Sequence, residues 1–258
     1  MSVRTLDKLA PPALFGAIVL VVWEAIVRVL HIPLVILPAA TVIFGRFIHS
    51  VPILAADFAQ TIQGALAGYG IGCGAGLLVA IAIDRSGFLQ RGLLPLGNLV
   101  SALPIVGVAP IMVMWFGFDW QSKAAVVVVM TFFPMLVNAV AGLASAGAME
   151  RDLMKTYGAS YFQTLLKLRL PAALPFIFNA LKINTTLAMI GAIVAEFFGT
   201  PTVGMGFRIS TEVGHMSIDM VWATIVVAAL TGSLSFALVA FAERRATFWH
   251  PSYRSGAN

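Results

Sequence analysis

The chain of 258 residues is 60% hydrophobic and only 10% charged, whereas an ordinary soluble domain carries about a quarter charged residues. That balance excludes a soluble globular domain and indicates a membrane protein. The formal net charge of +5 would also suit a nucleic-acid-binding protein. Cys73 is the single cysteine, which excludes an intrachain disulfide framework and a cysteine-based metal cluster.

Six apolar runs are long enough to cross a bilayer, whose hydrocarbon core of about 30 Å needs about 20 helical residues. They cover approximately residues 13–30, 61–83, 93–116, 124–145, 173–198 and 220–242. The segments between them are short and hold nearly all of the charge, which leaves no room for a soluble domain. The expected fold class is all-α, with one polytopic membrane domain over residues 1–258.

The first run follows Arg4 and Lys8 and therefore has some features of a secretory signal. It is longer than a typical signal core, contains Trp23 and Glu24, and lacks a small-residue cleavage site, so we expect a retained helix. An amphipathic segment near Thr41 to His49 follows it, and we expect this segment to lie along the outer membrane interface.

The second run carries glycines at every fourth position, Gly64, Gly68, Gly72 and Gly76. Small residues on one helical stripe let another helix approach closely in lipid. Close helix packing is therefore expected here. No strand precedes the run, so a phosphate-binding glycine loop is not expected.

The third run is interrupted by Pro95, Pro104 and Pro110. Proline removes a backbone donor, so this helix is expected to be kinked or partly unwound. Broken backbone at membrane depth is tolerated where it is buried in protein or lines a water-filled cavity. We favour a pathway-lining role, and a kinked packing helix is the alternative.

The loop between the fourth and fifth runs, residues 147–172, is the longest internal segment. A short helix is predicted from Glu150 to Tyr157, and Gly158 provides a bend after it. Ser160 followed by Gln163 has the form of a capping box, which predicts that a second helix begins there.

The second helix of this loop has a broad apolar face beside basic residues. Its apolar members are Tyr161, Phe162, Leu165, Leu166 and Leu168, and its basic members are Lys167 and Arg169. Pro171 is expected to break the helix before the fifth run. Such a helix could lie on the lipid surface or dock into a partner protein, and physics alone does not separate the two.

The basic residues are distributed unevenly between the segments that join the runs. With both termini in the cytoplasm, most lysines and arginines fall on the inside, among them Arg85, Arg151 and Arg244. The positive-inside rule explains this distribution without any nucleic acid. We therefore expect both termini to be cytoplasmic.

The loop resembles the cytoplasmic signature of binding-protein-dependent ABC importer permeases. That signature is a Glu-Ala-Ala triplet, a Gly four positions past its end, and an Ile two residues before Leu-Pro. Asp152 begins the diverged triplet, Gly158 matches the glycine, Leu168 the Ile, and Leu170 and Pro171 the closing pair. The chain also resembles the nitrate, sulfonate and taurine branch of these permeases, through LPAALP (170–175), IVAEFFG (193–199), VGMGFRI (203–209) and LPIVGVAPIMVMWFG (103–117).

The resemblance implies a type I ABC importer permease in the bacterial cytoplasmic membrane. Two permease copies would form the pore, a periplasmic or lipid-anchored binding protein would deliver a small anion or heteroaromatic solute, and a separate ATPase in two copies would bind ATP and Mg. The loop would seat a coupling helix in a groove of that ATPase. The expected coupling residues are Asp152, Gly158, Ala159, Ser160, Tyr161, Phe162, Leu165, Leu168 and Pro171.

Polar residues inside apolar runs are costly in lipid and are therefore candidates for the pathway. Asn184 and Thr185 lead this set, with hydrogen bonds to neighbouring helices as the alternative. Glu196 could line an outer gate or accept hydrogen bonds from the loop after it, and we favour the second role. Met112, Met114 and Trp115 could form an apolar gate, although packing is the commoner role of such residues.

Two further charged residues have simple expected roles. Lys182, in the fifth run, is expected to snorkel toward the cytoplasm. Arg208, in the outer loop after that run, could attract an anion or anchor the loop. The four histidines lie outside the runs and far apart in the sequence, so a metal site is not expected.

Catalytic motifs are missing from the sequence. No HExxH, Gly-x-Ser-x-Gly or Walker lysine loop occurs, so we do not expect an enzyme. A self-sufficient secondary transporter or channel is the main alternative function, although neither a midplane carboxylate nor an inverted repeat is evident. A membrane scaffold without transport activity is the second alternative.

Overall fold

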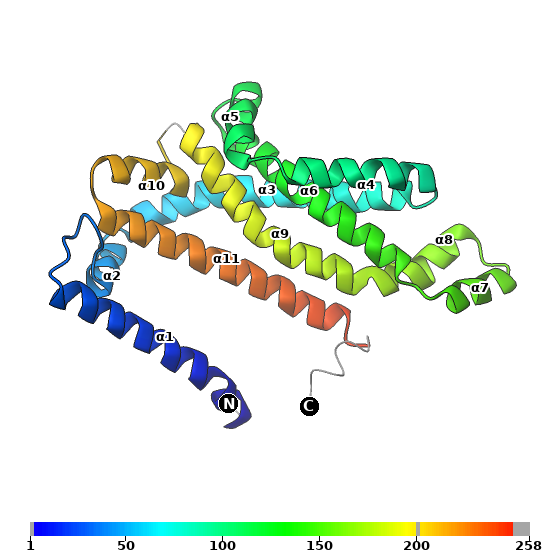
Figure 1. Cartoon of the computed structure of the whole chain (residues 1–258), viewed down its shortest axis with the longest axis horizontal. Helices are drawn as coiled ribbons and strands as arrows, with labels where there is room; N and C mark the ends of the chain where they lie inside the picture. The colour runs from blue at the N-terminus through cyan, green and yellow to red at the C-terminus, as the bar shows by residue number, and fades with distance from the viewer. Residues whose placement is uncertain (1–2, 200–201, 250–258) are drawn as a thin grey trace.

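The computed structural model describes residues 3–199 and 202–249, and within them the regular secondary structure is helical, without a strand. Figure 1 shows the arrangement of the helices. They are α1 (Val3–Val29), α2 (Ala40–His49), α3 (Val51–Ile83), α4 (Gly87–Ser101), α5 (Ile105–Phe116), α6 (Trp120–Ala144), α7 (Ala148–Thr156), α8 (Tyr161–Thr164), the π-helix η1 (Leu165–Arg169), α9 (Leu170–Phe198), α10 (Met205–Gly214) and α11 (Ile218–Ala246).

Five helices of the described residues are long and apolar enough to cross a membrane. They contain the segments Ala10–Val29, Val51–Ile83, Trp120–Ala144, Tyr161–Phe198 and Ile218–Ala246. The third predicted run, residues 93–116, is instead divided between α4 and α5. The break lies before Pro104, whose backbone is extended (φ −67°, ψ 116°), because proline disfavours a helical conformation in the residue before it. The predicted interruption is therefore present, but it separates two shorter helices.

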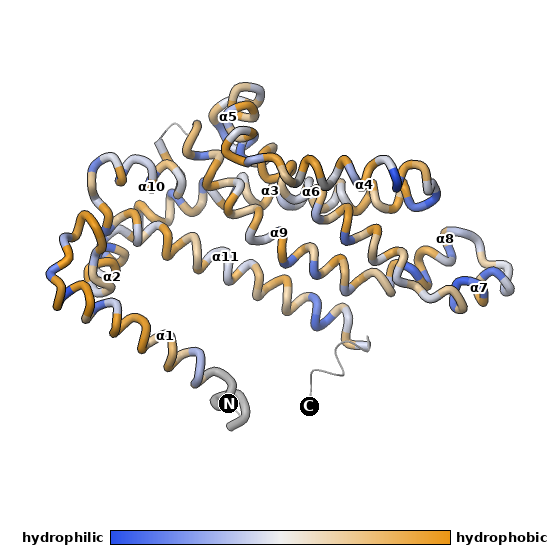
Figure 2. Tube along the Cα trace, in the orientation of Figure 1, coloured by the Kyte–Doolittle hydropathy of each residue, from blue (hydrophilic) through white to orange (hydrophobic). Residues whose placement is uncertain are grey.

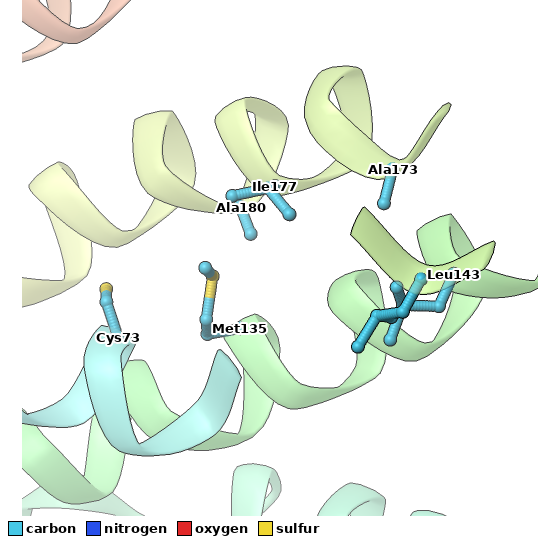
Figure 3. Packing of buried hydrophobic residues seen from close by; sticks show 7 residues of the cluster. Cys73, Met135, Leu143, Ala173, Ile177 and Ala180 are labelled. Carbon is cyan, nitrogen blue, oxygen red and sulfur yellow. The ribbon is translucent and has the colours of Figure 1, made fainter. Parts of the chain in front are cut away.

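The centre of the bundle is formed by α3, α6 and α9. The four glycines of the predicted stripe in α3 are all buried, and all four face backbone atoms of α6. A Cβ at Gly68 would lie 2.5 Å from Ala124 O, and one at Gly76 would lie 2.6 Å from Phe132 O. The predicted close approach of a second helix is confirmed. Figure 3 shows the adjoining apolar cluster, in which Cys73, Met135, Leu143, Ala173, Ile177 and Ala180 pack between these three helices.

The helix that begins at Tyr161 continues without a break to Phe198. The predicted break at Pro171 is therefore wrong. The turn before the proline is π-helical, and Leu170 N–H donates to Leu165 O, five residues earlier. This wider turn accommodates the missing donor and the bulk of the proline ring.

The bundle has two distinct ends. The helices α7 and α8 and the connection between α3 and α4 lie together at one, which we call the α7–α8 end, and α2 and α10 lie at the other, the α10 end (Figure 1). Figure 2 shows hydrophilic residues concentrated in α7 and near the α3–α4 connection, with apolar residues along the long helices between the two ends. The amphipathic α2 matches the predicted segment and buries Ile43 against Leu54 and Met220.

Candidate functional site

Two short helices, α7 and α8, follow α6 in the chain and project from the α7–α8 end of the bundle (Figure 1). α7 ends near Gly158, which has φ +67° and thus forms the predicted bend. Glycine adopts this left-handed conformation without a steric penalty. In α7 the Lys155 ammonium lies 2.9 Å from Asp152, and this hydrogen bond holds the pKa of the Asp152 carboxyl below its usual value.

The predicted capping box begins α8. Ser160 Oγ accepts a hydrogen bond from Gln163 N–H (3.3 Å), and Gln163 Oε1 accepts one from Ser160 N–H (2.8 Å). This reciprocal pair fixes the residue at which the helix begins, after the turn at Gly158 and Ala159. Because α8 passes through η1 into α9 without interruption, a displacement of α8 would also move α9.

The apolar side chains of α8 and η1 point in two directions. Leu165 is buried in the core cluster, and Tyr161 packs against the same cluster. Phe162 and Leu166 are 64% and 62% exposed. The prediction of one broad apolar face is therefore wrong, because successive helical residues are rotated by about 100° and this face is divided between the core and the surface. Leu168 is half-buried.

Asp84, directly after α3, was not predicted to contact this segment. Tyr161 Oη donates to Asp84 Oδ2 (2.9 Å), and Arg169 forms an ion pair with the same carboxylate. An acidic residue at the end of an apolar run is an ordinary feature of membrane helices. The sequence therefore contains no signal for a contact between residues this far apart.

Asn184 and Thr185 do not face an open space in this chain. Both are buried, and Asn184 Nδ2 donates to Thr131 O (2.9 Å) and lies 3.1 Å from Cys73 Sγ. Thr185 Oγ1 donates to Lys182 O (2.7 Å), within its own helix. These contacts correspond to the packing alternative.

The exposed face of α9 instead carries residues that recur at steps of three or four. They are Phe176, Asn179, Ile183, Thr186 and Ile190. This face borders a groove of about 630 Å³ between α9, α10 and α11, whose lining includes Thr186, Ile190, Ile209, Ile225 and Ser233. The lining has hydroxyl groups and no charged side chain.

Met112 is separated from Met114 and Trp115, the other two residues proposed for an apolar gate on α5. Met112 is half-buried and packs with Ala109, Val126 and Ala195. Trp115 is 71% exposed. The environment of Met112 is that of a packing residue, whereas Trp115 lies on the surface of the chain.

Glu196 ties the start of α10 to α3 and α9. Its carboxylate is buried, accepts a hydrogen bond from Gly206 N–H (2.7 Å) and one from Thr61 Oγ1 (2.9 Å). Thr61 Oγ1 in turn accepts one from Met205 N–H (2.9 Å). The favoured prediction, that Glu196 binds the loop after α9, is thus confirmed.

Asp57, which the sequence did not single out, is a second buried carboxylate at this end. It accepts hydrogen bonds from Gly204 N–H (2.9 Å) and from Arg208 Nε (2.8 Å). The hydrogen bond to Asp57 raises the pKa of the Arg208 guanidinium, which stays charged. Arg208 therefore anchors the loop, which was one of its two expected roles. Asp57 and Glu196 together hold the N-terminus of α10.

Lys182, which was expected to snorkel, has a partner on another helix. Its ammonium forms an ion pair with Glu243 Oε2 of α11, at 2.7 Å. A buried charge is stabilised when it is paired, and Glu243, in the last turn of α11, provides that partner. This contact joins α9 to α11.

Residues 72–248 match the family described as "binding-protein-dependent transport system inner membrane component". The chain belongs to this family. It is 31% identical over 229 residues to the formylaminopyrimidine transport permease protein ThiX of Halalkalibacterium halodurans, covering 88% of this chain and 91% of that protein. It is 28% identical over 243 residues to the putative aliphatic sulfonates transport permease protein SsuC of Bacillus subtilis, covering 93% and 87% of the two chains.

The solved structures agree on the fold. A chain of the MetNI methionine ABC transporter, in an inward facing conformation, superposes with a TM-score of 0.59 at 20% identity, covering 76% of this permease and 95% of that chain. The permease thus has the type I ABC importer fold and belongs to the nitrate, sulfonate and taurine branch. It is a multi-pass membrane component of an importer that works with a binding protein and an ATPase, and the secondary-transporter alternative is wrong.

Proposed function

We propose that the permease forms the translocation pathway for a small solute and that α7 and α8 couple it to the ATPase. The observation that carries the coupling role is a capped helix that exposes Phe162 and Leu166 and continues unbroken into α9. Exposed apolar side chains on a short helix suit a groove in a partner protein. The rigid connection to α9 supplies a route by which movement of the partner reaches the membrane helices.

The chain's own part is mechanical, and ATP and Mg are bound by the partner ATPase. We propose that the α7–α8 end and both termini are cytoplasmic, as the distribution of basic residues indicates. The α10 end then faces the binding protein. Asp57 and Glu196 would keep α10 in a fixed position against the bundle while the binding protein docks.

For the pathway, we propose the exposed face of α9, with Asn179 and Thr186, in place of the buried Asn184 and Thr185. A second copy of the permease would cover this face and enclose the pathway. Among the solutes expected for this branch, the uncharged groove beside Thr186 favours a heteroaromatic compound over a small anion. An anion would lose hydration there without gaining a cationic partner in the lining.

The experiment uses vesicles containing the permease with its ATPase, supplied with ATP on the ATPase side and loaded binding protein on the other. We expect ATP-dependent uptake by the wild type and its loss in Phe162→Asp, because a charge would disrupt docking of an exposed apolar side chain without disturbing the core. Gly158→Pro should also abolish uptake, since proline cannot adopt the positive φ of the bend.

The matched control is Phe88→Asp. Phe88 is another exposed phenylalanine at the α7–α8 end, but it lies at the start of α4, outside the segment. We expect Phe88→Asp to retain uptake and ATPase binding. Wild-type uptake and wild-type solute-stimulated ATP hydrolysis in Phe162→Asp would show that the coupling assignment is wrong.

A further inference from the structure

The carboxylate of Asp84 lies where the α7–α8 segment meets the rest of the bundle. Its side chain is 3% exposed, and it accepts hydrogen bonds from both terminal nitrogens of Arg169, at 2.5 and 2.6 Å. Tyr161 Oη donates a third, at 2.9 Å. A bidentate arginine pair fixes direction as well as distance, so the end of α3 is held in one orientation against α8 and η1.

Arg169 extends this connection to a third long helix. Its Nε donates to Leu143 O (2.9 Å), near the end of α6. The guanidinium of Arg85, next to Asp84 in the chain, lies 3.9 Å from the centroid of the Tyr161 ring, within the range of a cation–π contact. The ends of α3 and α6 therefore both contact the segment through Asp84, Arg85 and Arg169.

A buried ion pair is a poor device for stability alone, because well-packed apolar residues of similar volume often stabilise a protein as well or better. A bidentate pair differs from apolar packing in resisting rotation and sliding of the two elements. At a junction that must transmit displacement, that property matters more than the net stabilisation.

We propose that Asp84 is a positioning residue for coupling, which makes α8, η1 and the ends of α3 and α6 move as one unit. This inference rests on the proposed coupling role of α7 and α8. Movement of the ATPase would then reach α3 and α6 directly, in addition to α9 through the continuous helix. Without the Asp84 contacts, α8 would move relative to α3, and ATP hydrolysis would be transmitted incompletely.

The test measures solute uptake and ATP hydrolysis in the same vesicles and compares their ratio. Asp84→Asn keeps the size of the side chain and removes its charge. We expect this variant to assemble with the ATPase and to hydrolyse ATP, while uptake per ATP falls at least about fivefold, the low end of typical coupling effects. Arg169→Gln should also lower the ratio, and the double variant should be no worse than Arg169→Gln alone, because the Asp84–Arg169 pair is already absent from that variant.

Arg91→Gln is the matched control for the loss of an arginine. Arg91 is exposed at the same end, and within the part of the chain that the structure describes its side chain bonds only to Gly87 O of its own helix. The ratio of uptake to ATP hydrolysis in Arg91→Gln should therefore equal that of the wild type. If Asp84→Asn does not assemble, Tyr161→Phe removes one hydroxyl and leaves the ion pair, and it should lower the ratio in the same direction. A wild-type ratio in an assembled Asp84→Asn or Tyr161→Phe complex would overturn the inference, whereas failure of the wild type itself to couple uptake to ATP would overturn the proposed function.

Discussion

The glycine stripe of α3 allows a sharp test of the packing between α3 and α6. Gly68 is buried, and a Cβ there would lie 2.5 Å from Ala124 O and 2.5 Å from Val127 Cβ. Neither atom is the far end of a flexible side chain, so the two helices would have to separate. Gly70, on the same helix, is exposed and has no atom within 4 Å of its added Cβ.

The comparison of Gly68→Ala with Gly70→Ala isolates the packing cost. Both substitutions change the intrinsic helix propensity equally, by roughly 0.5 to 1 kcal/mol in favour of alanine, so this contribution cancels. Overpacking a tight core costs about 1 to 3 kcal/mol. We therefore expect Gly68→Ala to be less stable than Gly70→Ala by about 1 to 3 kcal/mol, the overpacking cost.

The measurement is reversible unfolding of the purified permease in mixed micelles. The fraction of SDS is raised stepwise, and the helix content is followed as the signal. Gly74→Ala is a second control, since Gly74 also faces open space. Equal unfolding midpoints for Gly68→Ala and the two exposed variants would refute the reasoning, because they would mean that α3 and α6 are not in close contact at this position.

Two further predictions concern the α10 end. Glu196→Gln places an amide where Gly206 N–H and Thr61 Oγ1 both donate, and a buried donor left unsatisfied costs about 1 to 3 kcal/mol. We therefore expect a lower unfolding midpoint than for the control Glu212→Gln, which loses only a 3.5 Å contact to Arg208. Equal midpoints for the two variants would contradict the hydrogen bonds described for Glu196. The second prediction concerns which end of the bundle is cytoplasmic. A membrane-impermeant maleimide added to intact cells should label His215→Cys, beside α10, and should not label Lys155→Cys, in α7; the buried Cys73 should not react in either variant. Labelling of Lys155→Cys but not of His215→Cys would show that the proposed orientation is inverted.

The sequence alone determined the class of fold and several local features. Apolar runs identify membrane helices because lipid excludes unpaired polar groups, and that constraint acts on each helix separately. The Gly158 bend, the Ser160 capping box and the glycine stripe were likewise predictable, since each depends on residues within a single helix or turn. The resemblance of residues 103–117 and 150–175 to the importer permeases identified the family for the same reason, because such motifs are local.

The partners of the charged residues were decided only by the tertiary structure. Lys182 with Glu243, Asp84 with Arg169, and Asp57 with Arg208 each join different helices, and helical periodicity says nothing about which helix lies opposite. The same limit explains why the sequence left two alternatives open for Asn184, which in the structure donates to Thr131 O. A polar residue in an apolar run must find a partner, but whether that partner is a neighbouring helix, a second chain or water depends on how the helices pack around it.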